Sequence, residues 1–331
     1  MRIFLKSNCF AAAPDRFMRV ELGSRIVQLR SLFKPGASTV GNLPPEALRE
    51  LVPDNPRLLA LKDRYSKNTE LPHSFWNSWE KHLELTRFRG EDNYVSQAYI
   101  RQNTRRYELS YAYIEATDSL GLLDKLSEDD LFGIKLWEFV PGKRVSRDLL
   151  DAILEITFLK QAMGFNFEDR LRVLDIGAGY GRFAYRFNTV SPASKITCID
   201  PIATSTFLSE FYLKFRKCPG TDIVPFDEFS SLQGRTFDVA ANIHSWSECT
   251  KQFIGWWLDR LVELKVPYLF IVPHVPELET VETNGLHLTY DDELEKRGFK
   301  LVLRRQKFSA SKLVQSAGIF PTDYRLYQRT P

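Results

Sequence analysis

Three glycines at alternating positions are the residues most suggestive of chemistry: Gly177, Gly179 and Gly181 follow an apolar run that contains Asp175. Glycine permits a tight turn and a close approach by a ligand, and the N–H groups of a following helix suit a polar or anionic group. Dinucleotide enzymes place the last glycine one residue later, where this chain has Arg182. The Asp175 carboxylate would repel a pyrophosphate, but it can accept hydrogen bonds from the ammonium group of a bound amino acid.

The pattern Asp-x-Gly-x-Gly-x-Gly after a strand resembles motif I of the class I methyltransferases that use S-adenosylmethionine (SAM). In that family an acidic residue at the end of the next strand binds the ribose hydroxyls, and Asp200 is the matching residue here. Adenine contacts often follow the third strand, where this chain has Phe226 and Asp227. The resemblance covers residues 171–331 and implies SAM as the cofactor. Its expected ligands are Asp175, Gly177, Gly179, Gly181, Asp200, Phe226, Asp227 and Asn242.

The residues after the fourth expected strand are candidates for the chemical step, because reacting groups in doubly wound folds lie at the carboxyl ends of strands. The stretch runs from Asn242 to Cys249 and contains His244 and Glu248. A hydroxyl acceptor must lose a proton as it is methylated, and a histidine is largely neutral at cytoplasmic pH. His244 is the expected general base, with Glu248 orienting it. Further contacts with the acceptor are expected from Tyr94, Gln97, Ser245, Trp246, His274 and His287.

The same stretch resembles a bacterial group of sugar O-methyltransferases, in which Asn-Ile-His-Ser-aromatic-x-Glu follows the fourth strand and a helical region precedes the SAM domain. Residues 88–97 resemble the N-terminal signature of that group. The resemblance implies methylation of a sugar hydroxyl on a glycan precursor or a nucleotide-linked sugar. Methylation of amino groups in DNA is disfavoured, because Ile243 and His244 replace the proline pair typical of those enzymes. Three alternatives stay open: methylation of another small-molecule natural product, a non-catalytic SAM-binding scaffold, and a nicotinamide oxidoreductase.

The elements that must position these residues alternate between strands and helices from residue 171 onward. Strands are expected at 171–176, 195–200, 221–225, 236–242, 267–272, 299–306 and 323–328, and helices at 180–190, 204–216, 249–264 and 290–297. This alternation predicts a Rossmann-like α/β domain over 166–331 with a mostly parallel seven-stranded sheet and an antiparallel final strand. Residues 1–165 carry mainly helical patterns. They are expected to form a helical domain that builds the substrate cleft or a lid.

Composition and charge bear on whether the protein binds nucleic acid, spans a membrane or holds a metal. The chain has 331 residues and a net charge of +3, with basic and acidic residues interleaved, so a nucleic-acid partner is not expected. No apolar run approaches the roughly 18 residues of a membrane span. The four cysteines form no Cys-x-x-Cys pair, which gives no indication of a zinc site, and no metal site is expected elsewhere. A cytoplasmic protein is expected, and its oligomeric state is left open.

Overall fold

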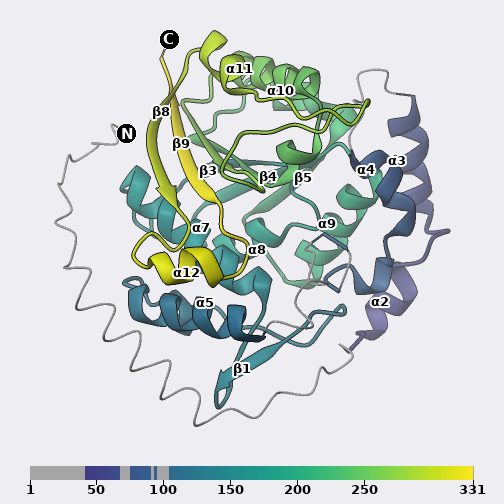
Figure 1. Cartoon of the computed structure of the whole chain (residues 1–331). Coiled ribbons are helices and arrows are strands. Elements are labelled where there is room, and N and C mark those ends of the chain that lie inside the picture. The colour runs from purple at the N-terminus through teal and green to yellow at the C-terminus, as the bar shows by residue number, and fades with distance from the viewer. Residues whose placement is uncertain (1–41, 68–74, 91–92, 95–103, 331) are drawn as a thin grey trace. The chain divides into compact units, whose positions relative to one another are not determined.

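The computed structural model describes residues 42–67, 75–90, 93–94 and 104–330 (Figure 1). The chain divides into two compact units, which are described separately. The first comprises the described parts of Met1–Pro44, Thr86–Asn166 and Arg305–Pro321. The second comprises the described parts of Pro45–Leu85, Phe167–Arg304 and Thr322–Pro331. The second unit therefore includes a segment from the N-terminal half of the chain as well as the expected α/β region.

A seven-stranded sheet forms the centre of the second unit, in the order β5-β4-β3-β6-β7-β9-β8. Its strands are β3 (Arg172–Ile176), β4 (Lys195–Asp200), β5 (Thr221–Pro225), β6 (Val239–Ile243), β7 (Tyr268–Val272), β8 (Phe299–Gln306) and β9 (Asp323–Arg329). The pairs from β5 to β7 are parallel, and β9 runs antiparallel to β7. The expected mostly parallel sheet, with an antiparallel final strand, is confirmed.

The helices of this unit follow the strands that the sequence predicts. They are α8 (Arg182–Val190), α9 (Ala203–Phe215), α10 (Lys251–Glu263) and α11 (Asp291–Lys296), with the short 3-10 segments η4 (Phe226–Leu232) and η5 (Ser245–Glu248) after β5 and β6. The Thr250 hydroxyl caps α10 by accepting from the N–H of Phe253. In the parallel register, Ile176 is opposite Ile199 on one side and Asn242 on the other. The turns after β3, β4 and β6 therefore emerge at one edge of the sheet, here called the carboxyl edge.

The N-terminal part of the second unit contributes α2 (Pro45–Glu50), α3 (Pro56–Ser66), α4 (Phe75–Trp79) and the 3-10 turn η1 (Glu80–His82). Asn55 caps α3 by accepting from the N–H of Arg57, and Pro56 occupies the first helical position, where its missing N–H costs nothing. Helix α3 packs against α9 and η4. Residues 45–85 therefore cover elements that follow β4 and β5.

The first unit contains α5 (Thr104–Thr117), α6 (Leu122–Lys125), α7 (Arg147–Met163) and α12 (Lys312–Ala317). Ser146 caps α7 by accepting from the N–H of Leu149, and Gly164 ends it in a left-handed conformation. The unit also contains a hairpin of β1 (Trp137–Val140) and β2 (Lys143–Val145). The 3-10 turn η2 (Leu85–Arg87) lies at the boundary, because Leu85 belongs to the second unit and the rest of the turn to the first. The hairpin was not expected from the helical patterns of this half, because its two strands are too short to show a clear alternation.

In the described part of the chain, no helix is both long and apolar enough to cross a membrane. The expected domain boundary at residue 165 lies beside the division between Asn166 and Phe167. The proposed role of the helical half as a substrate cleft or lid remains a prediction.

Candidate functional site

The glycine turn after β3 is held in a shape that only glycines adopt readily. Gly177, Gly179 and Gly181 all have positive φ angles, of 67°, 58° and 86°. The N–H of Gly177 donates to the carbonyl of Ile199 at 2.9 Å, which ties the turn to the end of β4. Asp175 is buried at the end of β3. The turn thus has the strand–turn–helix setting that the sequence predicts.

Asp200 is directed at this glycine turn. Its two carboxylate oxygens accept from the N–H of Gly179 and the N–H of Ile202, both at 2.9 Å. Burial raises the pKa of Asp200 to about 7, although these two hydrogen bonds act in the opposite direction. The Ser205 hydroxyl also donates to this carboxylate, so three of its roughly four acceptor positions are in use. The remaining position can accept a hydrogen bond from a ligand hydroxyl.

Of the two residues after β5 that are expected to contact adenine, Phe226 lies in the core. The Phe226 ring is buried and packs against Tyr65, Phe253, Trp256 and Trp257, so its expected stacking on adenine remains a prediction.

The Asp227 carboxylate is held by Arg64 of α3, whose Nε donates to Oδ2 at 2.7 Å. Asp227 Oδ1 is buried and has no hydrogen-bond partner among the described residues. A buried acceptor without a donor is costly, and an exocyclic amine is a donor that would satisfy it.

Residues 45–85 reach the carboxyl edge at several further points. The Tyr65 hydroxyl lies 2.9 Å from Thr206 Oγ1 and accepts from the N–H of Phe226 at 2.7 Å. Glu80 accepts from the N–H of Thr204 at 3.0 Å, in the first turn of α9, where a carboxylate is favourable. These contacts fix the segment beside the ends of β4 and β5.

Tyr65→Phe is expected to lower the free energy of unfolding by about 1–2 kcal/mol, because the buried N–H of Phe226 loses its acceptor. Urea denaturation followed by circular dichroism measures the change. Tyr111→Phe is the matched control, since its hydroxyl contacts only a half-buried carboxylate of Glu115 among the bonds described, at 3.3 Å. An equal loss in both variants would contradict the proposed anchoring role of Tyr65.

The end of β6 packs directly against the glycine turn. The Asn242 amide donates to the carbonyl of Ile176 at 3.0 Å and to Ser245 Oγ at 2.6 Å, and its oxygen accepts from the N–H of Trp246. A Cβ added to Gly177 would lie 2.1 Å from Ser245 Oγ. Asn242 and Ser245 therefore shape the turn, and their expected contacts with cofactor and acceptor remain predictions.

His244 occupies a strained backbone position at the end of β6, with φ 70° and ψ −35°. Such conformations cost about 1–3 kcal/mol in residues other than glycine and cluster at functional sites. The N–H of His244 donates to the carbonyl of Val272 at 2.7 Å, and the ring lies against His274, with 4.9 Å between centroids. The structure thus brings His244 and His274 together at the carboxyl edge.

Glu248 lies in the same group of side chains. Its Oε1 is 3.6 Å from His274 Nε2, and its Oε2 accepts from the indole N–H of Trp76 on α4. Burial and, to a smaller extent, the charge of Asp200 raise the pKa of Glu248 to about 8, although the Trp76 hydrogen bond acts in the opposite direction. Glu248 therefore faces His274, whereas the sequence analysis expected it to orient His244.

The other candidates for acceptor contacts lie in different settings. Trp246 is 1 % exposed and packs edge-on against Tyr290, which is a core position. His287 is exposed, and its ring bonds to the carbonyl of Thr280. Tyr94 belongs to the first unit, and Gln97 lies outside the described residues. The acceptor role of all four remains a prediction.

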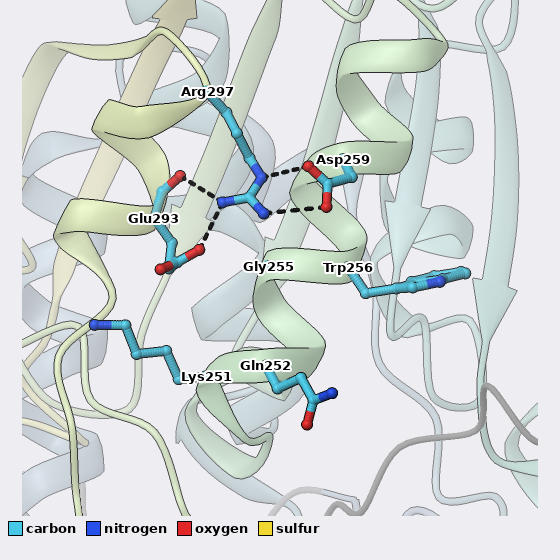
Figure 2. A pocket seen from close by; sticks show the side chains of 7 residues that line it. All are labelled: Lys251, Gln252, Gly255, Trp256, Asp259, Glu293 and Arg297. Carbon is cyan, nitrogen blue, oxygen red and sulfur yellow. Dashed lines mark hydrogen bonds and ion pairs between the residues drawn. The ribbon is translucent and has the colours of Figure 1, made fainter.

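A separate pocket of about 380 Å³ opens between α10 and α11 (Figure 2). It is lined by Lys251, Gln252, Gly255, Trp256, Asp259, Glu293 and Arg297. Arg297 binds Asp259 through two nitrogens, at 2.7 and 3.1 Å, and also binds Glu293. Arg297 lowers the pKa of Asp259, and the hydrogen bonds from Lys296 and Arg297 lower the pKa of Glu293. None of the residues expected to bind cofactor or acceptor lines this pocket.

The sequence does not indicate that Arg64, Tyr65, Trp76 and Glu80 contribute to the site. Each of them contacts a partner far away in the chain. Helical periodicity reports which face of a helix is buried and not which distant group that face meets. No local signal in the sequence could have found them.

No protein-family model and no curated protein matches the sequence. Among solved structures, a SAM-dependent methyltransferase from Aquifex aeolicus is 16 % identical, with a TM-score of 0.38 over 53 % of this chain and 89 % of that one.

Two further solved structures resemble the chain to a similar degree. Magnesium protoporphyrin IX methyltransferase from Synechocystis PCC 6803, with bound SAM, is 11 % identical, with a TM-score of 0.39 over 56 % and 83 % of the two chains. The [4+2]-cyclase SpnF is 13 % identical, with a TM-score of 0.41 over 59 % and 87 %. Likenesses this distant carry no argument about activity.

Proposed function

We propose that the protein binds SAM at the carboxyl edge and transfers its methyl group to a hydroxyl of a small molecule. The observation that carries the proposal is the placement of Asp200 against the glycine turn of Gly177–Gly181, with one hydrogen bond joining the two. The buried Asp227 Oδ1, which has no hydrogen-bond partner among the described residues, provides an acceptor of the kind that an adenine amine needs. Together these acceptor groups fit the ribose and the adenine of an adenosine.

In this proposal Asp175 binds the ammonium group of the cofactor, Asp200 its ribose and Asp227 its adenine. When bound, SAM supplies an electrophilic methyl group and leaves as the thioether S-adenosylhomocysteine (SAH). His244, His274 and Glu248 stand where the acceptor would be deprotonated, beyond the ends of β6 and β7. Residues 45–85 cover part of the same edge.

A sugar hydroxyl is the acceptor class that we propose, on the resemblance of residues 242–249 to sugar O-methyltransferases. Another small-molecule natural product is the alternative, and the cytoplasmic location remains a prediction. The test is incubation with methyl-labelled SAM and a panel of nucleotide sugars and hydroxylated natural products. Labelled product together with SAH release supports the proposal. Transfer only to amines, or to no member of the panel despite SAH binding, would contradict the assignment to a hydroxyl.

A further inference from the structure

Two successive residues of η5, Ser247 and Glu248, contact His274 at the carboxyl edge. The His274 backbone N–H donates to the Ser247 hydroxyl at 3.0 Å, and the His274 ring faces the Glu248 carboxylate, with Nε2 3.6 Å from Oε1. The turn η5 thus holds both the backbone and the ring of His274. The side chain of His274 is 44 % exposed and that of Glu248 is 19 % exposed. The histidine is accessible to a ligand, whereas the carboxylate lies behind it.

Trp76 binds the other oxygen of the same carboxylate. Its indole N–H donates to Glu248 Oε2, and an indole N–H can only donate. The Glu248 carboxylate therefore lies between the Trp76 indole, which does not titrate, and the His274 ring, which does. A carboxylate fixed in this way sets the orientation of the neighbouring imidazole and favours the tautomer with the proton on Nε2.

Building on the proposed function, we propose that His274 and Glu248 form a single proton-accepting pair for the methyl acceptor, and that Trp76 is the residue that positions the Glu248 carboxylate. This arrangement assigns to His274 the role that the sequence analysis gave to His244. His244, whose ring packs against that of His274, contributes to the wall of the site.

The proton moves between defined atoms. The acceptor hydroxyl gives its proton to His274 Nδ1 while its oxygen gains the methyl carbon, and the electron pair of the broken C–S bond stays on sulfur. The imidazolium that forms keeps its Nε2–H directed at Glu248. The ionised carboxylate stabilises this positive charge, so the pair accepts protons best when Glu248 is ionised. No oxidant, reductant or further reactant is needed.

Burial makes the ionisation of Glu248 difficult at neutral pH, and the charge of Asp200 at the end of β4 adds to this effect. The other titratable groups near Glu248 are Cys249, next in the chain, and the two histidines His274 and His244. With the pKa of Glu248 raised to about 8, the fraction of ionised carboxylate increases as the pH rises from 7 to 9. Methyl transfer should increase over the same range.

The test is an NMR titration of protein carrying ¹³C-labelled histidine, with the His274 ring signal assigned by its loss in His274→Ala. We expect two steps in wild-type protein, one from the ring itself and one near pH 8 from Glu248, because the two groups are coupled. Glu248→Gln should leave a single step. Trp76→Phe should move the step near pH 8 upward by about half a unit to one unit, since one hydrogen bond to the carboxylate is lost.

Trp79→Phe is the matched control, because this residue of α4 contacts Phe75 and His82 and should leave both steps in place. Identical His274 titrations in wild type and Glu248→Gln would overturn the pair. An unshifted step in Trp76→Phe would overturn the role of Trp76. The titration needs no cofactor. If the protein shows two coupled steps but fails to bind SAH, the proposed function is refuted and the coupling of His274 with Glu248 is not.

Activity provides a second reading once an acceptor from the panel is methylated. His274→Ala should lower kcat by about a hundredfold or more with little change in the KM for SAM, and His244→Ala should have a much smaller effect. The reverse order of effects would contradict the pair and restore His244 as the base. Asp222→Ala, a change to an exposed residue of β5 that pairs with Arg235, should leave kcat unchanged.

Discussion

Asp200→Ala is expected to weaken SAH binding by about a hundredfold. The carboxylate faces the glycine turn and would accept a hydrogen bond from the ribose hydroxyls, and a bond to a charged group contributes about 1.5–3 kcal/mol. A hundredfold change in Kd corresponds to about 2.7 kcal/mol. Isothermal titration calorimetry measures the change directly.

The pH dependence of this affinity is a second part of the same prediction. Because the pKa of Asp200 is raised to about 7, the carboxyl group is largely protonated at pH 6 and ionised at pH 8. SAH should therefore bind more tightly at pH 8, and this dependence should disappear in Asp200→Ala. Asp222→Ala removes the same charge from an exposed residue of β5, which pairs with Arg235 at 2.5 Å, and should leave binding unchanged. Equal weakening by both substitutions would show a nonspecific effect of charge.

Gly177→Ala is expected to lower the free energy of unfolding by about 3 kcal/mol or more, and to abolish SAH binding in any folded protein that remains. An alanine Cβ would lie 2.1 Å from Ser245 Oγ and 2.5 Å from Ser245 Cβ, closer than any real contact. The positive φ of 67° adds backbone strain. The turn after β3 and the end of β6 would have to separate, which displaces both sides of the candidate site. Chemical denaturation measures the loss of stability.

Gly234→Ala separates the steric effect from the backbone effect. Gly234 has a φ of 79°, and a Cβ built there meets nothing within 4 Å. The Gly234→Ala substitution should therefore lower the free energy of unfolding only by the backbone strain, about 1–2 kcal/mol. Adding Ser245→Gly to Gly177→Ala removes both close contacts and should recover part of the lost stability. A loss in Gly177→Ala no greater than that in Gly234→Ala would contradict the close packing described here.

The sheet of the second unit could be predicted well from the sequence. Most of its strands contain apolar or β-branched runs between turn residues, and the observed bounds of β4, β5 and β8 coincide with the expected ones. The glycine turn and Asp200 were also predictable, because their residue types and spacing are local in the chain. The hairpin of β1 and β2 was not, since strands of four and three residues carry little periodicity.

The part of the candidate site that the sequence could not predict depends on contacts between distant segments. Trp76 and Tyr65 meet residues at the ends of β6 and β5, and helical patterns identify their faces as buried without identifying what they meet. The orientation of Glu248 is a similar case. Its expected pairing with His244 remains a prediction, and its contact with His274 joins the turn after β6 to the residues after β7, which no local pattern indicates.

The measurement that most directly tests SAM binding at the carboxyl edge is calorimetric titration of the folded wild-type protein with SAH and, separately, with NADH. We expect SAH to bind with a Kd in the micromolar range and a stoichiometry of one per chain, and NADH to give no heat of binding. Binding of NADH without SAH would assign the glycine turn to a dinucleotide. Binding of neither ligand by folded protein would contradict the assignment of Asp175–Gly181 and Asp200 to an adenosine cofactor.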